Sequence, residues 1–261
     1  MILDRFKLTD RVAIVTGAGR GIGEGVALAL AEAGADVACA ARSSGEIEDT
    51  ASRIRALGRR ACAIPCDVME RDQLENLVDT ARSELGRIDI LVNNAGGWPP
   101  KAALRTSEKD FEAAFRFNVT SAFLMTRFSV PHMVEAGGGA IVNISSAAGR
   151  LAQPGFAAYG TAKAALSFLT KNLASEFAPK IRVNAIAVGS VETSALATIL
   201  NDELRHKMES LTPMGRIGSV EDIAACALYL ASPAAAWVTG KVFEVDGGIE
   251  ATNFRMPTPE L

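Results

Sequence analysis

Three side chains in the middle of the chain have types and spacing that suit proton transfer to a carbonyl oxygen. Tyr159 and Lys163 are four residues apart, so on a helix they share one face about one turn apart. A free tyrosine loses its proton near pH ~10, and an ammonium group beside it favours the phenolate and lowers that pKa. Ser146 follows the apolar run 141–144, and its hydroxyl can donate a hydrogen bond to the same oxygen. The pattern predicts acid–base chemistry, although such a Tyr–Lys pair also occurs on ordinary helix surfaces.

Strands and helices alternate around these residues. Short runs rich in β-branched residues predict strands, and the segments between them predict helices. The predicted strands are 11–16, 36–41, 60–65, 87–92, 141–146, 181–186 and 241–245. The predicted helices are a segment ending at Gly34, 46–57, 70–85, 107–136 with an interruption near Pro131, one beginning near Phe156, and 219–230. This alternation predicts an α/β fold: one domain, 1–261, with a Rossmann-like, doubly wound parallel sheet and helices on both faces.

The composition is that of an ordinary globular protein, with 49% hydrophobic residues, 22% charged residues and a net charge of −3. This charge gives no electrostatic reason to expect nucleic acid or an anionic membrane as a partner. No apolar run approaches the ~18 residues of a membrane span, and the N-terminus has no signal pattern, so we expect a cytoplasmic location. The four cysteines form no Cys-x-x-Cys pair and the two histidines lie far from them in sequence, so we expect no metal site.

A glycine-rich turn joins the first predicted strand to the first predicted helix. The turn has the sequence GAGRGIG, and the glycines that define its spacing are Gly17, Gly21 and Gly23. A turn of this kind brings backbone N–H groups against a pyrophosphate at the N-terminus of a helix. The spacing differs from the G-x-G-x-x-G of the usual dinucleotide fingerprint, and a glycine-rich turn can be only a tight connection. Its place between a strand and a helix nevertheless favours a dinucleotide coenzyme.

The residues after the second predicted strand favour NADP(H) over NAD(H). An acidic residue there would accept a hydrogen bond from the ribose 2′-hydroxyl of NAD and repel a 2′-phosphate. This chain instead has Ala41 followed by Arg42 and Ser43. A guanidinium can bind a phosphate through two hydrogen bonds, and a serine can donate another. Arg20, within the glycine-rich turn, is either a second cation for the same region or a solvated loop charge.

Together these motifs resemble the short-chain dehydrogenase/reductase family over residues 8–249. A serine lies thirteen residues before the tyrosine and a lysine four after it, and Thr-Gly-x-x-x-Gly-x-Gly, Asn-Asn-Ala-Gly and WVTGKVFEVDGG follow the family order. The resemblance implies a catalytic tetrad of Asn118, Ser146, Tyr159 and Lys163. Asn118 would hold a water that links the lysine to solvent. Ser145, one residue out of register, is expected to be structural.

The resemblance also implies how the coenzyme is held. Asp67 would bind the adenine amino group, cap the N-terminus of the helix after it, or do both. Relatives usually have Pro-Gly where this chain has Val188-Gly189. The implied coenzyme contacts are Gly17, Arg20, Gly21, Ile22, Gly23, Arg42, Ser43, Asp67, Val68, Asn94, Ala95, Gly96, Tyr159, Lys163, Gly189, Val191 and Thr193. Residues 190–215 would form a mobile lid over the substrate, the tail 251–261 has no assigned state, and relatives are mostly homotetramers.

The predicted function is that of an NADP(H)-dependent oxidoreductase that interconverts a ketone and a secondary alcohol. The small residues 147–149 beside Ser146 leave room for a wide substrate. Within the family, the chain looks most similar to bacterial 7α-hydroxysteroid dehydrogenases through Asn-Asn-Ala-Gly-Gly, the following Pro100-Lys101 and the segment SPAAAWVTG. A 3-oxoacyl-acyl-carrier-protein reductase is the alternative, and Arg150 and Arg205 are its scattered candidates for meeting an acidic carrier. A catalytically silent scaffold on the same fold is the alternative from another class, and the presence of all four tetrad residues argues against it.

Overall fold

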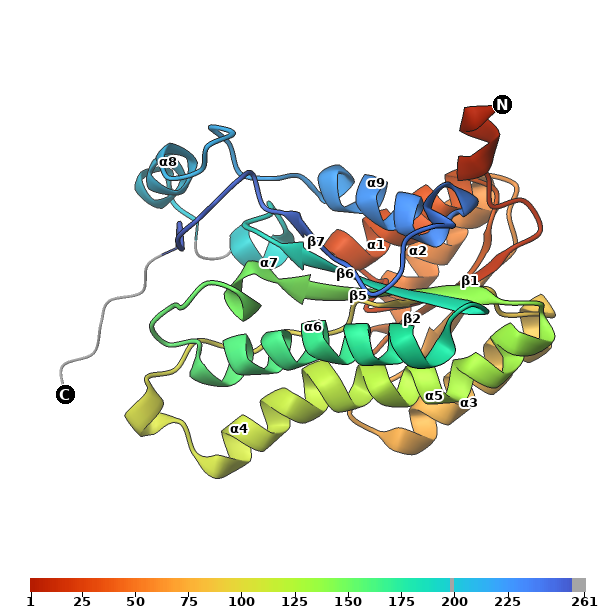
Figure 1. Ribbon diagram of the computed structural model, residues 1–261, viewed down its shortest axis with the longest axis horizontal. Coiled ribbons are helices and arrows are strands. Elements are labelled where there is room, and N and C mark those ends of the chain that lie inside the picture. Colours follow the sequence, from red (N-terminus) through yellow and green to blue (C-terminus); the bar gives the residue numbers. More distant parts are fainter. Residues whose placement is uncertain (198–199, 255–261) are drawn as a thin grey trace.

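A seven-stranded sheet forms the centre of the computed structural model, which describes residues 1–197 and 200–254 (Figure 1). Every neighbouring pair of strands is parallel, and the order is β3-β2-β1-β4-β5-β6-β7. The strands are β1 Val12–Thr16, β2 Asp36–Ala41, β3 Ala61–Pro65, β4 Ile90–Asn93, β5 Gly139–Ser146, β6 Ile181–Val188 and β7 Val242–Val245. The order reverses between β1 and β4, which is the doubly wound arrangement that the sequence predicts.

Helices cover both faces of the sheet, which explains why its strands are almost continuously apolar. One layer consists of α1 Gly21–Glu32, α2 Ser44–Ala56 and α9 Val220–Ala231. The other consists of α3 Arg71–Leu85, α4 Glu108–Phe115, α5 Ser121–Glu135 and α6 Ala157–Phe177. Two short helices, α7 Ser194–Ala197 and α8 Asp202–Ser210, follow β6. Each layer packs its own apolar core against the sheet, around Leu30 and Ile223 on one face and Leu77 and Met125 on the other.

The helical region 107–136 is interrupted, but not where the sequence analysis places the interruption. Pro131 lies inside α5 and does not end it. The break is instead a π-helical turn, Arg116–Thr120, between α4 and α5. Asn118 lies in this turn and bonds to the backbone of Gly97, a contact 21 residues away in sequence. The expectation about Pro131 is therefore wrong, because a distant hydrogen-bonding partner distorts the helix at Asn118 while α5 accommodates the proline.

Two helix starts show where local capping patterns succeed and fail. Ser219 caps α9, accepting from the Asp222 N–H at 3.4 Å while the Asp222 carboxylate accepts from the Ser219 N–H at 2.7 Å. Asp67 does not cap α3, since Glu70 is the N-cap residue. The Asp67 carboxylate accepts from the Met69 N–H at 3.0 Å and so turns the loop before the helix. The capping alternative for Asp67 is therefore wrong.

The fourth strand begins at Ile90 rather than at residue 87. Arg87 and Asp89 precede it and bond to each other through their side chains. Among the residues that the structure describes, no helix is long and apolar enough to cross a membrane.

Candidate active site

A cleft of about 720 Å³ opens at the carboxyl ends of the strands, where the strand order reverses. This is the place at which open α/β sheets bind their ligands. All the coenzyme contacts predicted from the sequence line this cleft, and Ser146 lines it with them. Asn118 lies behind the cleft wall and is almost fully buried. The structure therefore brings the predicted residues together from the ends of β1 to β6 and the segments that follow them.

The glycine-rich turn has a shape that side chains would prevent. Gly17 and Gly21 have φ angles of +66° and +58°, a region that favours glycine. A Cβ atom on Gly23 would collide with the carbonyl oxygen of Gly17. The turn leads directly into α1, whose N-terminus carries the partial positive charge that suits a phosphate. This cradle fits the pyrophosphate of a dinucleotide.

Asn94 fixes the cradle to the sheet. Its side-chain amide donates to the carbonyl oxygens of Thr16 and Gly17 at 2.9 and 3.2 Å. The Thr16 hydroxyl accepts from the backbone N–H groups of Asn94 and Ala95, both at 3.1 Å. Thr16 is not among the contacts predicted from the sequence, although it stands at the threonine position of the glycine motif. These bonds join the ends of β1 and β4 on either side of the reversal.

Ser146, Tyr159 and Lys163 meet at the end of β5. The Lys163 ammonium group lies 5.8 Å from the centre of the Tyr159 ring and donates to the Ile144 carbonyl oxygen at 2.7 Å. The Ser146 hydroxyl accepts from the Ala148 N–H at 3.2 Å. Lys163 is only 3% exposed, so its charge lies inside the protein without a carboxylate partner in the described part of the chain.

Burial is the largest influence on the pKa values of Tyr159 and Lys163. It raises the pKa of Tyr159, and the hydrogen bond with Ser146 acts in the opposite direction. It lowers the pKa of Lys163 to about 7, because the ammonium form loses its hydration. The lowering of the Tyr159 pKa that the spacing predicts does not appear in this arrangement, because burial outweighs the hydrogen bond with Ser146. Spacing predicts that the two side chains are neighbours, but the surrounding protein decides which way their pKa values move.

Asn118 reaches this group from the π-helical turn. Its amide nitrogen donates to the carbonyl oxygens of Ala114 and Gly97 at 2.9 and 3.0 Å, and its oxygen accepts from the Gly97 N–H at 2.9 Å. A Cβ atom on Gly96 would lie 2.7 Å from the Asn118 oxygen and 2.9 Å from the Lys163 nitrogen. Gly96 thus leaves the space in which Asn118 and Lys163 approach each other.

Ser145 has the structural role that the sequence analysis expects. It is 2% exposed, and its hydroxyl donates to the carbonyl oxygen of Lys163 at 3.0 Å and contacts the Ser167 hydroxyl at 2.8 Å. These bonds hold α6 against β5. They fix the distance between Ser146, at the strand end, and the side chains on the helix.

The loop after β6 is held without the proline that relatives carry. The Gly189 N–H donates to the Val245 carbonyl at 3.0 Å, and a Cβ atom on Gly189 would lie 2.6 Å from the Cα of Asp246. Val191 pairs with Gly218 in an isolated parallel bridge. Backbone contacts thus fix both ends of this cleft wall where Val188 replaces the proline.

The cations at the far end of the cleft have an acidic neighbour that the sequence analysis missed. Arg42 is exposed, and Arg20 is 68% exposed with its guanidinium 3.9 Å from the Glu46 carboxylate. Glu46 lines the cleft from the first turn of α2. The position of Glu46 shortly after Ser43 could have indicated this contact. The first turn of a helix that begins at the end of a strand faces the cleft at that strand end.

A second hollow of about 430 Å³ adjoins the cleft at Ser146 and Tyr159. Every described residue that lines it is uncharged. Part of its wall comes from the tail: the Gln153 amide donates to the Phe254 carbonyl at 2.5 Å, and the rings of Phe156 and Phe254 meet edge to face. The sequence predicts no state for the tail 251–261. Residues 252–254 contribute to this wall, and 255–261 lie outside the described residues.

Arg150 and Arg205, the basic candidates for an acidic carrier, already have acidic partners. Arg150 bonds to the Asp246 carboxylate at 2.8 Å and Arg205 to the Glu192 carboxylate at 2.5 Å. The described part of the chain contains no group of three or more His, Cys, Asp or Glu side chains able to hold a metal ion.

Comparisons with known proteins agree with this geometry. A family model described as enoyl-(acyl carrier protein) reductase matches residues 17–250. An uncharacterized oxidoreductase of Mycobacterium tuberculosis (strain CDC 1551 / Oshkosh) is 52% identical, and the match covers 100% of both chains. The chain belongs to the short-chain dehydrogenase/reductase family.

Solved structures of family members have the same fold. A 7α-hydroxysteroid dehydrogenase in complex with NADH and 7-oxo glycochenodeoxycholic acid matches with a TM-score of 0.91 and 40% identity, covering 94% of this chain and 96% of that one. A gluconate 5-dehydrogenase from Burkholderia cenocepacia J2315, in complex with NADP and tartrate, matches with a TM-score of 0.89 and 36% identity, covering 95% and 98%. These two relatives were thus solved with different nicotinamide coenzymes.

Proposed function

We propose that this short-chain dehydrogenase/reductase interconverts a ketone and a secondary alcohol with NADP(H). The observation that carries the proposal is that Ser146 and Tyr159 line both hollows, the glycine-walled cleft and the uncharged hollow beside it. A substrate in the second hollow therefore presents its oxygen to these hydroxyls at the border with the coenzyme cleft.

Each residue of the tetrad has a separable task. A bound nicotinamide supplies or accepts the hydride. Tyr159 donates the proton to the carbonyl oxygen in the direction of reduction, and Ser146 donates a hydrogen bond that stabilises the charge on that oxygen. Lys163 favours the proton transfer from Tyr159, and Asn118 positions a water that returns a proton to Lys163. Asn118 and Lys163 are buried, which strengthens their interactions.

The preference for NADP(H) is supported by charges at the end of β2. Ala41 offers no acceptor to a ribose 2′-hydroxyl, and the exposed Arg42 guanidinium is available to a 2′-phosphate. Glu46 acts against this preference because its carboxylate lies in the same part of the cleft. Two cations, Arg20 and Arg42, outweigh it there.

The uncharged second hollow supports a bulky, apolar ketone, with a hydroxysteroid as the leading class. A 3-oxoacyl-acyl-carrier-protein remains the second candidate, and the description of the matching family model favours it. The pairing of Arg150 and Arg205 with carboxylates weakens that candidate, because neither guanidinium is left to meet an acidic carrier. We retain residues 190–215 as a lid over this hollow; residues 198–199 lie outside the described residues. A catalytically silent scaffold is the alternative that activity measurements would test.

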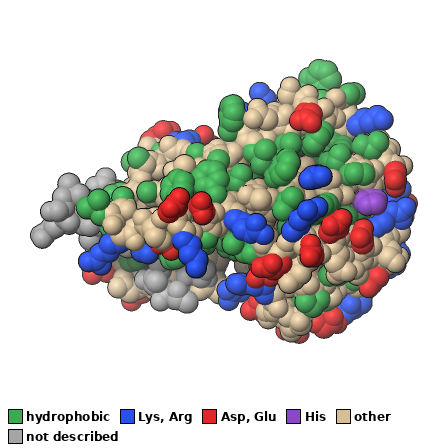
Figure 2. Space-filling view, turned by 90° about the horizontal axis from the view of Figure 1, so that it is seen from below, with side chains coloured by type: hydrophobic (Ala, Val, Ile, Leu, Met, Phe, Trp, Pro, Cys, Tyr) green, Lys and Arg blue, Asp and Glu red, His purple; other side chains and the backbone are tan. Residues whose placement is uncertain are grey.

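Homotetramer formation and a cytoplasmic location stay predictions of the sequence. For assembly, Figure 2 shows apolar side chains gathered in a band on the side of the molecule that carries α4 and α5. Exposed aromatic residues on α4, α5 and α6 are Phe111, Phe123 and Phe168. A band of this kind suits contact with a second copy of the chain.

Replacing Tyr159 by phenylalanine tests the activity. The wild type is expected to reduce a steroidal ketone with NADPH in preference to a 3-oxoacyl thioester. Tyr159→Phe removes the transferable proton and should lower kcat by about 10²- to 10⁴-fold while the Kd for NADPH changes little. Steady-state kinetics and coenzyme fluorescence titration measure the two quantities.

The only other tyrosine provides the matched control. Tyr229 lies on α9 against Phe6 and Phe243, and Tyr229→Phe should leave turnover unchanged. Near-normal turnover of Tyr159→Phe would contradict the mechanism, and a wild type that reduces no carbonyl compound of either class would support the scaffold.

A further inference from the structure

A charged hollow lies at the amino ends of the strands, on the opposite side of the molecule from the active-site cleft. It measures about 220 Å³ and lies where the amino ends of β4, β5 and β6 meet the end of α9. Arg11, Lys180 and Arg182 line it, together with the single carboxylate Asp89. The tetrad, the glycine-rich turn and the second hollow all lie at the carboxyl ends of the strands. The proposed ketone chemistry therefore leaves these cations without a role.

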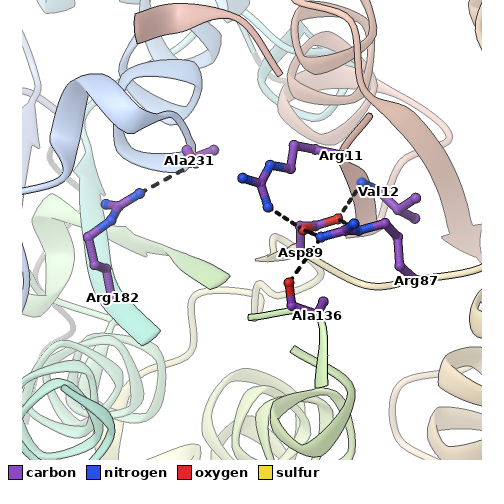
Figure 3. Close-up of polar contacts among 7 residues, drawn as sticks. All are labelled: Arg11, Val12, Arg87, Asp89, Ala136, Arg182 and Ala231. Carbon is purple, nitrogen blue, oxygen red and sulfur yellow. Dashed lines mark hydrogen bonds and ion pairs between the residues drawn. The ribbon is translucent and has the colours of Figure 1, made fainter. Parts of the chain in front are cut away.

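Asp89 is already saturated with donors. The Arg87 guanidinium donates to both of its oxygens, at 2.8 and 2.7 Å, and Arg11 donates to one of them at 2.7 Å. The Val12 N–H adds a fourth bond at 3.0 Å. Figure 3 shows Arg11 and Arg87 converging on this one carboxylate. One negative charge thus serves two guanidinium groups, and Asp89 has no capacity left for the other cations of the hollow.

Arg182 and Lys180 have no carboxylate within 4.0 Å in the part of the chain that the structure describes. Arg182 is half-buried, and its guanidinium donates to the carbonyls of Leu230 and Ser232 at 2.7 and 3.1 Å (Figure 3 shows it directed toward the neighbouring Ala231). Burial lowers the pKa of Arg182, as expected for a cation whose charge is not neutralised. Lys180 is exposed at the rim.

The charges around the hollow do not balance. The cations are Arg11, Arg87, Lys180 and Arg182, and the anions are Asp89 and Asp10, which acts on Arg87. Two positive charges are therefore left over locally, in a chain whose net charge is −3. A half-buried cation without a counter-ion is costly, and a bound anion offsets that cost.

The wall of the hollow leaves room for such an anion. Glycines 137–139 form one side, and Gly138 has a φ of +128°. A Cβ atom on Gly138 would lie 2.5 Å from the carbonyl oxygen of Lys180, so the glycine lets this loop lie against the start of β6. At about 30 Å³ per water, the hollow corresponds to roughly seven waters, which exceeds the size of one phosphate group.

We propose that this hollow is an anion site, distinct from the coenzyme cleft, that binds a small phosphate-bearing molecule through Arg11, Lys180 and Arg182. Guanidinium groups bind phosphate oxygens through paired hydrogen bonds, and the lysine adds a mobile positive charge. Binding there joins the start of β1, the start of β6 and the end of α9.

Titration with inorganic pyrophosphate at constant ionic strength tests the proposal. Calorimetry of the wild type should show saturable binding, and Lys180→Met should weaken it by about three- to tenfold, since an exposed cation contributes modestly to a charge-assisted contact. Lys180→Met is preferred to a change at Arg182, which also bonds to the end of α9. Backbone amide resonances of Gly138 and Gly139 should shift during the same titration.

Lys171→Met, at an exposed lysine on α6, is the matched control and should bind pyrophosphate like the wild type. Binding that Lys180→Met leaves unchanged would overturn the proposal, because it would place the anion in the coenzyme cleft or on the general surface. Equal weakening by both variants, or the absence of saturable binding, would overturn it as well.

Discussion

Lys163 has its amino group inside the protein, where its charge costs stability. Its pKa is about 7 in the folded chain against a usual value of 10.5. Between these values the unfolded chain binds more protons than the folded one, so this lysine makes stability rise with pH from about 7 to 10.5. Below pH 7 the buried ammonium group lowers the free energy of unfolding by its full amount. At 1.36 kcal/mol per pKa unit, the cost is at most about 5 kcal/mol.

Lys163→Met should therefore unfold at higher urea concentration than the wild type. The gain should be largest below pH 7 and should shrink toward pH 10, where the folded wild-type lysine is already neutral. Urea unfolding at several pH values measures the difference in the free energy of unfolding between the two proteins. Lys171→Met, which changes an exposed lysine on the same helix, should show little gain at any pH. A gain for Lys163→Met that is independent of pH would contradict the assignment.

We expect coenzyme choice to depend on three charges: Arg42 after β2, Arg20 in the turn before α1 and Glu46 in the first turn of α2. We expect kcat/KM to favour NADP(H) over NAD(H) by at least about tenfold, since charge-assisted hydrogen bonds contribute ~1.5–3 kcal/mol. Replacing Ala41 by Asp and Arg42 by Ser should reverse this preference, so that kcat/KM favours NAD(H). Arg20→Ala should weaken the preference for NADP(H) less than the double substitution does. Glu46→Gln should strengthen the preference for NADP(H), because it removes the carboxylate beside Arg20. A wild-type preference for NAD(H) would show that loop geometry outweighs these charges.

At the scale of residues, sequence spacing predicted proximity but not environment. A separation of four on a helix places Tyr159 and Lys163 together in any context, and the end of a strand places Ser146 beside them. Their pKa values depend on burial, which is a property of the whole surrounding structure. Glu46 was missed for a related reason: its distance to Arg20 depends on how α2 leaves the sheet.

At the scale of elements, strands were the most predictable part of the chain. β2 has the bounds that the sequence predicts, 36–41, because it lies between a glycine turn and a polar segment. The π-helical turn at Asn118 was not predictable, since it depends on Gly97 in another segment. The wall formed by 252–254 was equally unpredictable, because the tail has no periodicity and its position depends on contacts with distant residues.

The contacts of Asn253 connect this tail to the lid region. Its side chain is 4% exposed, donates to the Thr212 hydroxyl at 2.9 Å and accepts from the Ser190 hydroxyl at 2.8 Å. Asn253→Ala removes both bonds and should release Phe254 from the wall of the substrate hollow. With net hydrogen-bond contributions near 1 kcal/mol each, about 2 kcal/mol together, kcat/KM for a bulky ketone should fall by up to about thirtyfold.

The KM for the coenzyme should stay the same in Asn253→Ala, because the coenzyme cleft does not include the tail. Glu250→Gln, at a side chain that is 92% exposed just before the tail, is the control and should behave like the wild type. An equal loss for bulky and small ketones would argue that Asn253 supports the fold rather than the wall.

At the scale of the whole molecule, the apolar band of Figure 2 is the feature that calls for a partner. Phe168 on α6 is 63% exposed, which is unusual for a large aromatic side chain in a monomer. If copies of the chain associate through the face that carries α4, α5 and α6, Phe168→Glu should place a charge in the interface and dissociate the assembly into smaller species. Sedimentation velocity at micromolar concentration measures the distribution.

Leu57→Glu is the matched control, an exposed apolar residue after α2 on the other layer. It should leave the distribution unchanged. A Phe168→Glu protein that sediments like the wild type would show that the band does not hold the copies together.

The π-helical turn Arg116–Thr120 also sets the rotational phase of α5. A π turn contains about one residue more than an α turn, and one residue corresponds to a rotation of about 100°. Without it, side chains that now face the core, such as Met125 and Met133, would rotate outward, and the exposed Phe123 would rotate toward the interior. The extra residue that brings Asn118 to Gly97 thus also determines which side of α5 is exposed. A one-residue deletion in this turn would change the proton path and the outer surface in a single step.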